Sequence, residues 1–266
     1  MKIYDCITYF EEEFLFNLRL KILDKYVDYF VVCESIYSHK GEKKSKLFNP
    51  EIFKNYKHKI IHLVLDKFPE NLSRWERQDY QRDFIFEGLK EANDEDLIIF
   101  SDSDEIPDPK KFQDINFKYK FFLFDQKHFC YKFNIINHSE YLWEGTRGCK
   151  MKNLKSFNWL RTKIKKKNLN YSFWRFDKVK NIQIIENGGW HFSYFLSPTE
   201  IVNKINSSPH EEFINDKNLD KNIIQQRILS LSDPLGRKKT FKKINEMNIL
   251  PEEITTNFQL YKEWFI

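Results

Sequence analysis

The stretch Leu97–Pro109, LIIFSDSDEIPDP, decides the fold of this chain. Four consecutive apolar residues run directly into the acidic residues Asp102, Asp104 and Glu105, and two prolines close the segment. A short apolar run bounded by turn residues is typical of a strand that is buried on both faces of a sheet. In open α/β sheets, ligands bind just beyond the carboxyl ends of such strands. The stretch therefore predicts a central strand that ends in an acidic turn at a binding edge.

The acidic turn has two interpretations. Asp102 and Asp104 are two residues apart, so an extended backbone places both carboxylates on one side. Such a pair is half of a site for a hard cation, Mn²⁺ or Mg²⁺, which also grips phosphate oxygens. The alternative is a solvated turn, the usual state of an acidic loop. An EF-hand that begins at Asp102 is excluded because its sixth position is Pro107 instead of Gly. The chain also has no P-loop, GxGxxG or GxSxG motif.

Size and composition predict one packed domain. The chain has 266 residues, of which 41% are hydrophobic and 17% aromatic. Its first residues lack the apolar core of a secretory signal, and no window approaches the roughly 20 apolar residues of a membrane span. The four cysteines are widely spaced and form no CxxC pair, which argues against zinc and favours a reducing compartment. We therefore expect a cytoplasmic protein. The net charge of +5 does not by itself indicate nucleic-acid binding.

The pattern of the first hundred residues alternates between strands and helices. This alternation favours a mainly parallel sheet with helices on its faces. A capping box, Ser73-Arg74-Trp75-Glu76, starts the helix that leads to the central strand. Later patterns predict two paired strands rich in aromatic residues, one short strand and a helical final third. The expected strands are 3–10, 29–33, 60–65, 97–100, 120–125, 127–133 and 182–185, and the late helices are 199–204, 221–230 and 241–247.

Two further features leave alternatives open. Residues 145–176 contain ten Lys or Arg and no acid, which is either a solvated face or a binding patch. No RNP, KH or helix-turn-helix pattern accompanies them, so a nucleic-acid role is not expected. His191 follows Gly188, Gly189 and Trp190, and glycines allow the backbone to approach a ligand closely. His191 is therefore either a metal ligand or a hydrogen-bonded core histidine.

Glycosyl transfer from a nucleotide sugar uses a metal held by two carboxylates at a sheet edge. The metal neutralises the departing diphosphate, while a separate carboxylate deprotonates the acceptor hydroxyl. Several ordered blocks of this chain resemble glycosyltransferase family 17, and together they span roughly residues 3–230. The blocks are Tyr4-Asp5 with Leu18-Arg19-Leu20, Phe30 to Ser35 with Gly41, Asp102 to Pro107, Gly189 to Ser193, and Lys204-Ile205 before Ser208 and His210.

The resemblance implies a GT-A type, Rossmann-like α/β fold: a mainly parallel sheet flanked by helices, with a helical C-terminal part. It divides a single domain into a nucleotide-sugar-binding half (1–110), an acceptor and catalytic half (111–234) and a helical tail (235–266). It also implies an inverting enzyme that takes N-acetylglucosamine from UDP-N-acetylglucosamine. The implied metal ligands are Asp102, Asp104 and His191, and the implied donor-binding residues are Asp102, Glu34 and Arg77.

The catalytic base has two candidates, Glu144 and Glu105. Glu144 follows a tryptophan suited to stacking on a sugar, whereas Glu105 has the alternative role of orienting the metal carboxylates. The expected acceptor is a glycan or a lipid-linked glycan, and the basic segment 145–176 is suited to an anionic acceptor or to peripheral membrane contact. The competing functions are a non-catalytic carbohydrate-binding protein and a glycoside hydrolase that uses paired carboxylates.

Overall fold

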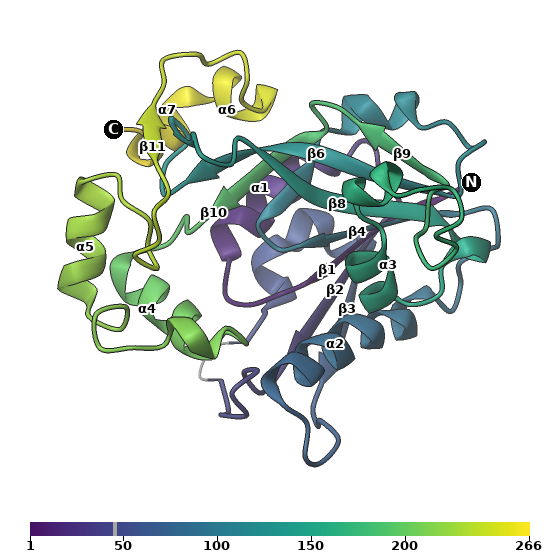
Figure 1. Ribbon diagram of the computed structural model, residues 1–266, viewed down its shortest axis with the longest axis horizontal. Coiled ribbons are helices and arrows are strands. Elements are labelled where there is room, and N and C mark those ends of the chain that lie inside the picture. Colours follow the sequence, from purple (N-terminus) through teal and green to yellow (C-terminus); the bar gives the residue numbers. More distant parts are fainter. Residues whose placement is uncertain (45–46) are drawn as a thin grey trace.

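The structure is a computed structural model that describes residues 1–44 and 47–266, and its centre is one mixed sheet (Figure 1). The strands are β1 (Ile3–Thr8), β2 (Tyr29–Ser35), β3 (Ile60–Leu65), β4 (Leu97–Asp102), β5 (Glu105–Pro107), β6 (Phe121–Cys130), β7 (Ile135–Asn137), β8 (Leu142–Lys150), β9 (Ile182–Ile185), β10 (Gly189–Ser193) and β11 (Phe241–Lys243). The α-helices are α1 (Glu13–Leu23), α2 (Arg74–Phe84), α3 (Phe157–Lys163), α4 (Pro198–Ser207), α5 (Lys221–Leu229), α6 (Glu252–Thr256) and α7 (Phe258–Tyr261).

The N-terminal part of the sheet is parallel and Rossmann-like. Its strands lie in the order β3-β2-β1-β4, and every pair in this run is parallel. Side chains alternate between the two faces, so Val31 and Cys33 pack towards α2 and α3 while Phe30 and Val32 pack with α1. The predicted strands and capped helix of this part are confirmed, as is the α/β fold with flanking helices.

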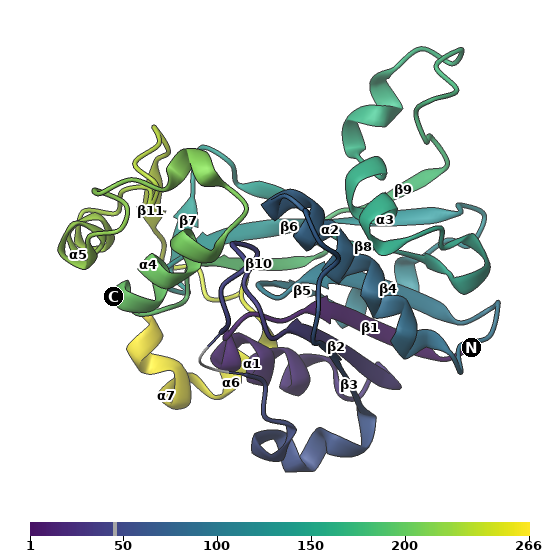
Figure 2. The same cartoon turned by 90° about the horizontal axis from the view of Figure 1, so that it is seen from below.

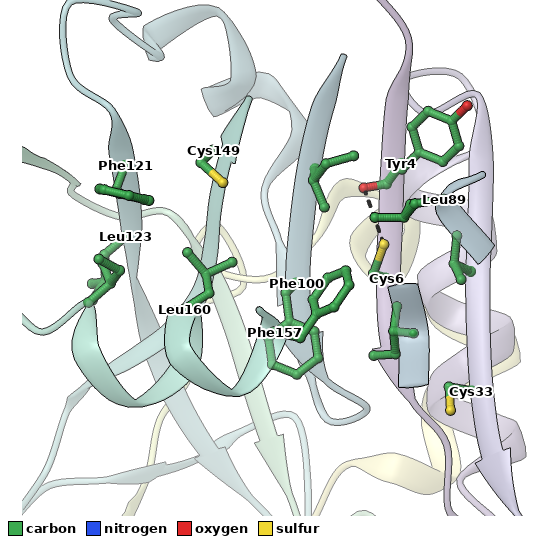
Figure 3. Close-up of a cluster of buried hydrophobic side chains, with 14 of the residues drawn as sticks. Tyr4, Cys6, Cys33, Leu89, Phe100, Phe121, Leu123, Cys149, Phe157 and Leu160 are labelled. Carbon is green, nitrogen blue, oxygen red and sulfur yellow. Dashed lines mark hydrogen bonds between the residues drawn. The ribbon is translucent and has the colours of Figure 1, made fainter. Parts of the chain in front are cut away.

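The core between the sheet and α3 is shown in Figure 3. Phe100 of the central strand contacts Phe157 of α3, with ring centroids 5.4 Å apart. Cys6 and Cys149 lie in the same cluster as buried thiols. All four cysteines of the chain are buried and free, as expected for small core residues.

The second part of the sheet combines both strand directions around β6, which is antiparallel to β7 and β8 but parallel to β9 and β10. The prediction of a mainly parallel sheet is therefore wrong for this part, and the sheet as a whole is mixed. The predicted strand pair at 120–125 and 127–133 is wrong, because 121–130 form one continuous strand whose antiparallel partner is β8. The sequence does not predict β8, because this strand contains two glycines and glycine is usually depleted in strands. Both are required by packing: a Cβ on Gly145 would lie 1.6 Å from the Gln126 side chain, and one on Gly148 would lie 2.2 Å from Phe122.

The C-terminal part covers the end of the sheet. The helices predicted near 199–204 and 221–230 are confirmed as α4 and α5. The helix predicted at 241–247 is wrong, because β11 pairs there with β7. Further on, Trp264 stacks on Phe14 of α1, with centroids 4.3 Å apart. Among the described residues, no helix is both long and apolar enough to cross a membrane.

Candidate functional site

The acidic turn lies where β4 ends, and a buried ion pair supports it. Arg19 of α1 is fully buried and binds both carboxylate oxygens of Asp5 at 2.5–2.6 Å. Its guanidinium also donates to the Glu105 carbonyl at 2.5 Å. On the other side, the backbone N–H of Phe192 in β10 donates to the Asp104 carbonyl at 2.8 Å. The turn is therefore held in place by α1 and β10.

Asp102 is paired with two arginines from different helices. Arg161 of α3 lies 2.7 Å from Oδ2, and Arg82 of α2 lies 3.3 Å from Oδ1. Burial opposes ionisation of Asp102, but these two guanidinium groups outweigh it and lower the pKa of the carboxyl. Asp102 is therefore held as a carboxylate that bridges two helices.

Asp104 has a lysine partner from α4. Lys204 Nζ lies 3.0 Å from Asp104 Oδ2 and donates to Glu12 Oε1 at 2.7 Å. Glu12 in turn accepts from Ser103 of the turn at 2.6 Å. Burial again opposes ionisation, yet Lys204 and then His191 hold the pKa of Asp104 well below its usual range. Burial by itself would lower the pKa of Lys204, but the carboxylates of Asp104 and Glu12 raise it.

Glu105 is completely buried, and both oxygens of its carboxylate accept hydrogen bonds. It accepts from Arg161 at 2.6 and 3.0 Å, from Trp143 Nε1 at 2.7 Å and from the Asp102 backbone N–H at 3.2 Å. The same guanidinium thus contacts Asp102 and Glu105. This geometry favours the orienting role of Glu105 over that of a base, because its oxygens already accept four hydrogen bonds from protein groups and none is left facing an acceptor hydroxyl.

Two cavities, each of ≈ 240 Å³, meet at the acidic turn. Asp102, Asp104 and Lys204 line both. The first cavity opens at the carboxyl ends of β1 and β2, which is where α/β sheets bind nucleotides. The second lies between the turn, β6 and β10. The first is lined among others by Thr8, Tyr9, Ser35, Tyr37, His39 and Gln81, and the second by His128, Asn137, Trp143, His191, Ser193 and Asp233.

Aromatic rings form one wall of the second cavity. Trp143 stacks on His191 with centroids 4.6 Å apart, and His128 packs against both rings, 4.5 Å from His191 and 5.6 Å from Trp143. Ser193 Oγ lies 3.0 Å from His128 Nε2 and 3.1 Å from His191 Nε2. Burial lowers the pKa of His128 to about 2, so its ring is neutral. Flat rings beside polar side chains such as Asn137 and Ser193 are a combination suited to a sugar ring.

The predicted metal ligands lie near one another. His191 Nε2 is 3.5 Å from Asp104 Oδ1, and Asp102 is two residues away in the same turn. Within the described ranges, no group of three or more His, Cys, Asp or Glu side chains is arranged to hold a metal. A cation at the acidic pair would therefore have to take its remaining ligands from substrate phosphates and water, as Mg²⁺ commonly does, and the metal stays a prediction.

Three other predicted residues lie outside the lining of both cavities. Glu34 is buried and accepts from the Phe48 backbone N–H at 3.0–3.1 Å. Arg77 donates to the His39 carbonyl at 2.9 Å and so supports the edge of the first cavity. Glu144 Oε2 accepts from the backbone N–H of Lys166 at 3.2 Å. Their roles in donor binding and catalysis stay predictions.

Sequence reasoning assigned no role to the three cations that hold the acidic pair. Lys204 lay in a block that carried the family resemblance, and Arg161 lay in the basic segment 145–176. Arg82 is five residues after Arg77 on the same helix, yet only Arg82 reaches Asp102. The sequence carries no signal for these contacts, because α2, α3 and α4 are far apart along the chain and converge on the turn only when it is folded.

Comparison with known proteins gives the family. The model of glycosyltransferase family 17 matches residues 1–257. β-1,4-Mannosyl-glycoprotein 4-β-N-acetylglucosaminyltransferase from Homo sapiens is 31% identical over 116 residues, as is the protein of that name from Rattus norvegicus. That stretch covers 40% of this chain and only 22% of either relative. A crystal structure of a glycosyltransferase involved in glycosylation of the major capsid of PBCV-1 is a distant neighbour, with 11% identity and a TM-score of 0.35 over 70% of this chain and 82% of that one. Because the family model spans nearly the whole sequence, this chain belongs to glycosyltransferase family 17.

Proposed function

We propose that this protein transfers N-acetylglucosamine from UDP-N-acetylglucosamine to a hydroxyl of a glycan, with inversion at the anomeric carbon. The observation that carries the proposal is the meeting of two cavities at Asp102, Asp104 and Lys204. One cavity is suited to a nucleotide and the other to sugar rings, so the bond to be broken would lie between them. Membership of family 17 and the names of the relatives support the choice of reaction and sugar.

In this proposal the nucleoside occupies the first cavity. The ends of β1 and β2 supply Tyr9 and Tyr37, whose rings are suited to a base and a ribose, and Ser35 and Gln81 supply polar contacts. The diphosphate would then reach the acidic turn. Lys204 is the cation that faces both cavities there. As the sugar leaves, negative charge grows on the diphosphate, and a lysine held in place by Glu12 is suited to stabilise it.

A divalent cation, Mn²⁺ or Mg²⁺, is part of the proposal. Asp102 and Asp104 would hold it together with diphosphate oxygens, and His191 lies beside Asp104. The cation would neutralise charge on the leaving diphosphate. Binding it requires Arg161 and Lys204 to share the two carboxylates that they contact in the structure. We therefore expect the metal and the nucleotide sugar to bind together, because the metal needs ligands from both the protein carboxylates and the diphosphate.

Inversion needs one direct displacement on the anomeric carbon. The acceptor hydroxyl attacks as the bond to the diphosphate breaks, and its proton passes to a base. Because Glu105 is fully hydrogen-bonded, the proposal gives it the role of fixing Arg161 and Trp143 in position. Glu144 faces the start of the 164–181 segment. Glu144, the other base predicted from the sequence, lines neither cavity, and the variant described in the Discussion tests whether it takes the proton. The free cysteines are compatible with the cytoplasmic location that the proposal includes.

The experiment measures UDP release from UDP-N-acetylglucosamine and the thermal shift caused by UDP with Mn²⁺. We expect a stabilising shift that requires both ligands, and turnover that chelation abolishes and Mn²⁺ restores. Asp104→Asn should lower turnover by roughly a thousandfold, the upper range for loss of one electrostatic group. Asp114→Asn is the matched control, because Asp114 is an exposed aspartate paired with Lys111 on the surface.

Three outcomes would overturn parts of the proposal. Turnover that a chelator does not affect would contradict the metal requirement. Full activity of Asp104→Asn would contradict the placing of the acidic turn in the active site. A folded protein that UDP-sugars neither stabilise nor react with, but that glycans stabilise, is a carbohydrate-binding protein. Screening GDP- and CMP-sugars in the same assay tests the choice of nucleotide.

A further inference from the structure

The segment between α3 and β9, residues 164–181, is the most exposed apolar part of the described chain. We call it the α3–β9 loop, and Figure 2 shows it standing away from the sheet. Phe173 is 80% exposed, Trp174 61% and Phe176 91%. Side chains of this kind are normally buried, and exposed aromatic clusters mark interaction sites.

Contacts within the loop hold these aromatic side chains outward. Lys180 Nζ donates to the Tyr171 carbonyl at 2.8 Å, and Arg175 forms a two-pronged ion pair with Asp177, with both contacts at 2.7 Å. Arg175 also lies over the Tyr171 ring at 5.2 Å. The loop thus has its own packing, from which the large aromatic side chains of its tip are left out.

Positive charge surrounds the aromatic tip. The α3–β9 loop contains six Lys or Arg and one acid, Asp177. Lys167 is exposed, as is Lys163 at the end of α3. The neighbouring Lys166 contacts Asp125 of β6, so the run of lysines at 165–167 lies at the base of the loop, next to the sheet. The order is a cationic base followed by an aromatic tip.

We propose that the α3–β9 loop docks this protein on an anionic phospholipid bilayer. The aromatic tip would enter the boundary between headgroups and acyl chains, where Trp and Phe are favoured. The lysines at its base would then lie at the level of the lipid phosphates, and each basic residue near an anionic surface adds about fivefold to binding. The proposal does not depend on the reaction, because it concerns a surface outside both cavities.

A membrane fits this arrangement better than a nucleic acid does. Strand-binding proteins stack bases on aromatic side chains along a positively charged groove. Here the aromatic side chains stand at the end of a projection, which is suited to insertion. The loop also continues from α3, which brings Arg161 to Asp102 and Glu105. Docking would therefore place the candidate site beside a membrane and favour a lipid-linked acceptor.

Sedimentation with vesicles tests the proposal without any substrate. The full chain should bind vesicles of phosphatidylcholine mixed with phosphatidylglycerol, and bind pure phosphatidylcholine at least about tenfold more weakly. The triple variant Phe173→Ser, Trp174→Ser and Phe176→Ser should lose at least about tenfold in binding. Lys163→Glu with Lys167→Glu should lose a similar factor and show a weaker dependence on salt.

The control variant is Leu229→Ser with Leu260→Ser, which removes two side chains that are 75% and 67% exposed elsewhere. It should bind the anionic vesicles as the wild type does. Asp104→Asn should also bind them, so failure of the proposed reaction and failure of docking are separate results. Equal binding to both kinds of vesicle, an unaffected triple variant, or tighter binding to a single-stranded oligonucleotide than to anionic vesicles would each overturn the proposal.

Discussion

The acidic turn and the α3–β9 loop each contain an arginine that forms a close ion pair, and the two pairs differ in their exposure to water. Arg161 contacts Asp102 and Glu105 at 2.6–2.7 Å, and Arg175 contacts Asp177 at 2.7 Å. The side chain of Arg161 is only 10% exposed, whereas that of Arg175 is 45% exposed. The contacts are alike, but water competes for only one of them. Equal distances therefore mark a fixed structural centre in one region and a minor surface contact in the other.

The largest expected effect comes from removing the buried guanidinium. Arg161→Met should lower the free energy of unfolding by about 3–5 kcal/mol, because it leaves the buried Glu105 and the partly exposed Asp102 without their shared cation. Arg175→Met should leave it nearly unchanged, because solvent screens an exposed ion pair. Urea denaturation of both variants measures the difference. Similar losses in the two variants would show that burial does not separate the two regions.

A smaller effect concerns the pH dependence of the buried region. Burial lowers the pKa of His128 to about 2, below its ordinary value of 6.5, so the folded chain keeps this ring neutral where the unfolded chain protonates it. The resulting stability is complete above pH 6.5 and is lost as the pH falls towards 2. Between pH 7 and pH 4 it amounts to roughly 3 kcal/mol.

Unfolding curves of His128→Gln should therefore show a weaker loss of stability on acidification than the wild type, by roughly that amount. His58→Gln changes an exposed histidine instead and is the matched control. Parallel pH profiles for wild type and His128→Gln would mean that the pKa of the ring is the same in the folded and unfolded chains. In that case the wall of the second cavity would carry a positive charge below about pH 6.5.

The same contrast explains how much of the fold could be predicted. Apolar runs such as Leu97–Phe100 signal strands by themselves, because burial on both faces needs no knowledge of partners. β8 could not be predicted, since its glycines are required by Gln126 and Phe122, residues on a different strand. β11 could not be predicted as a strand, because three residues are too few to show a period of two.

The candidate site divides in the same way. Asp102 and Asp104 could be predicted because a strand end places them at a binding edge. Arg82, Arg161 and Lys204 could not, because they come from three helices far apart in sequence and meet only at the turn. Likewise, the outward position of Phe173 and Trp174 could not be predicted, since exposure is a property of the folded chain.

The smallest expected effect concerns Glu144, which lies between the two regions. Its Oε2 accepts from the Lys166 backbone at the base of the α3–β9 loop, and it lines neither cavity. We therefore expect Glu144→Gln to change kcat by less than about threefold, whereas loss of a general base costs about a hundredfold or more. Steady-state kinetics with saturating UDP-sugar decides between them, with Glu140→Gln, a partly exposed glutamate paired with Lys239, as the control. A hundredfold fall in kcat with an unchanged KM for the donor would establish Glu144 as the base. It would also mean that the acceptor approaches the anomeric carbon from the side of the α3–β9 loop, which would join the two regions in one reaction.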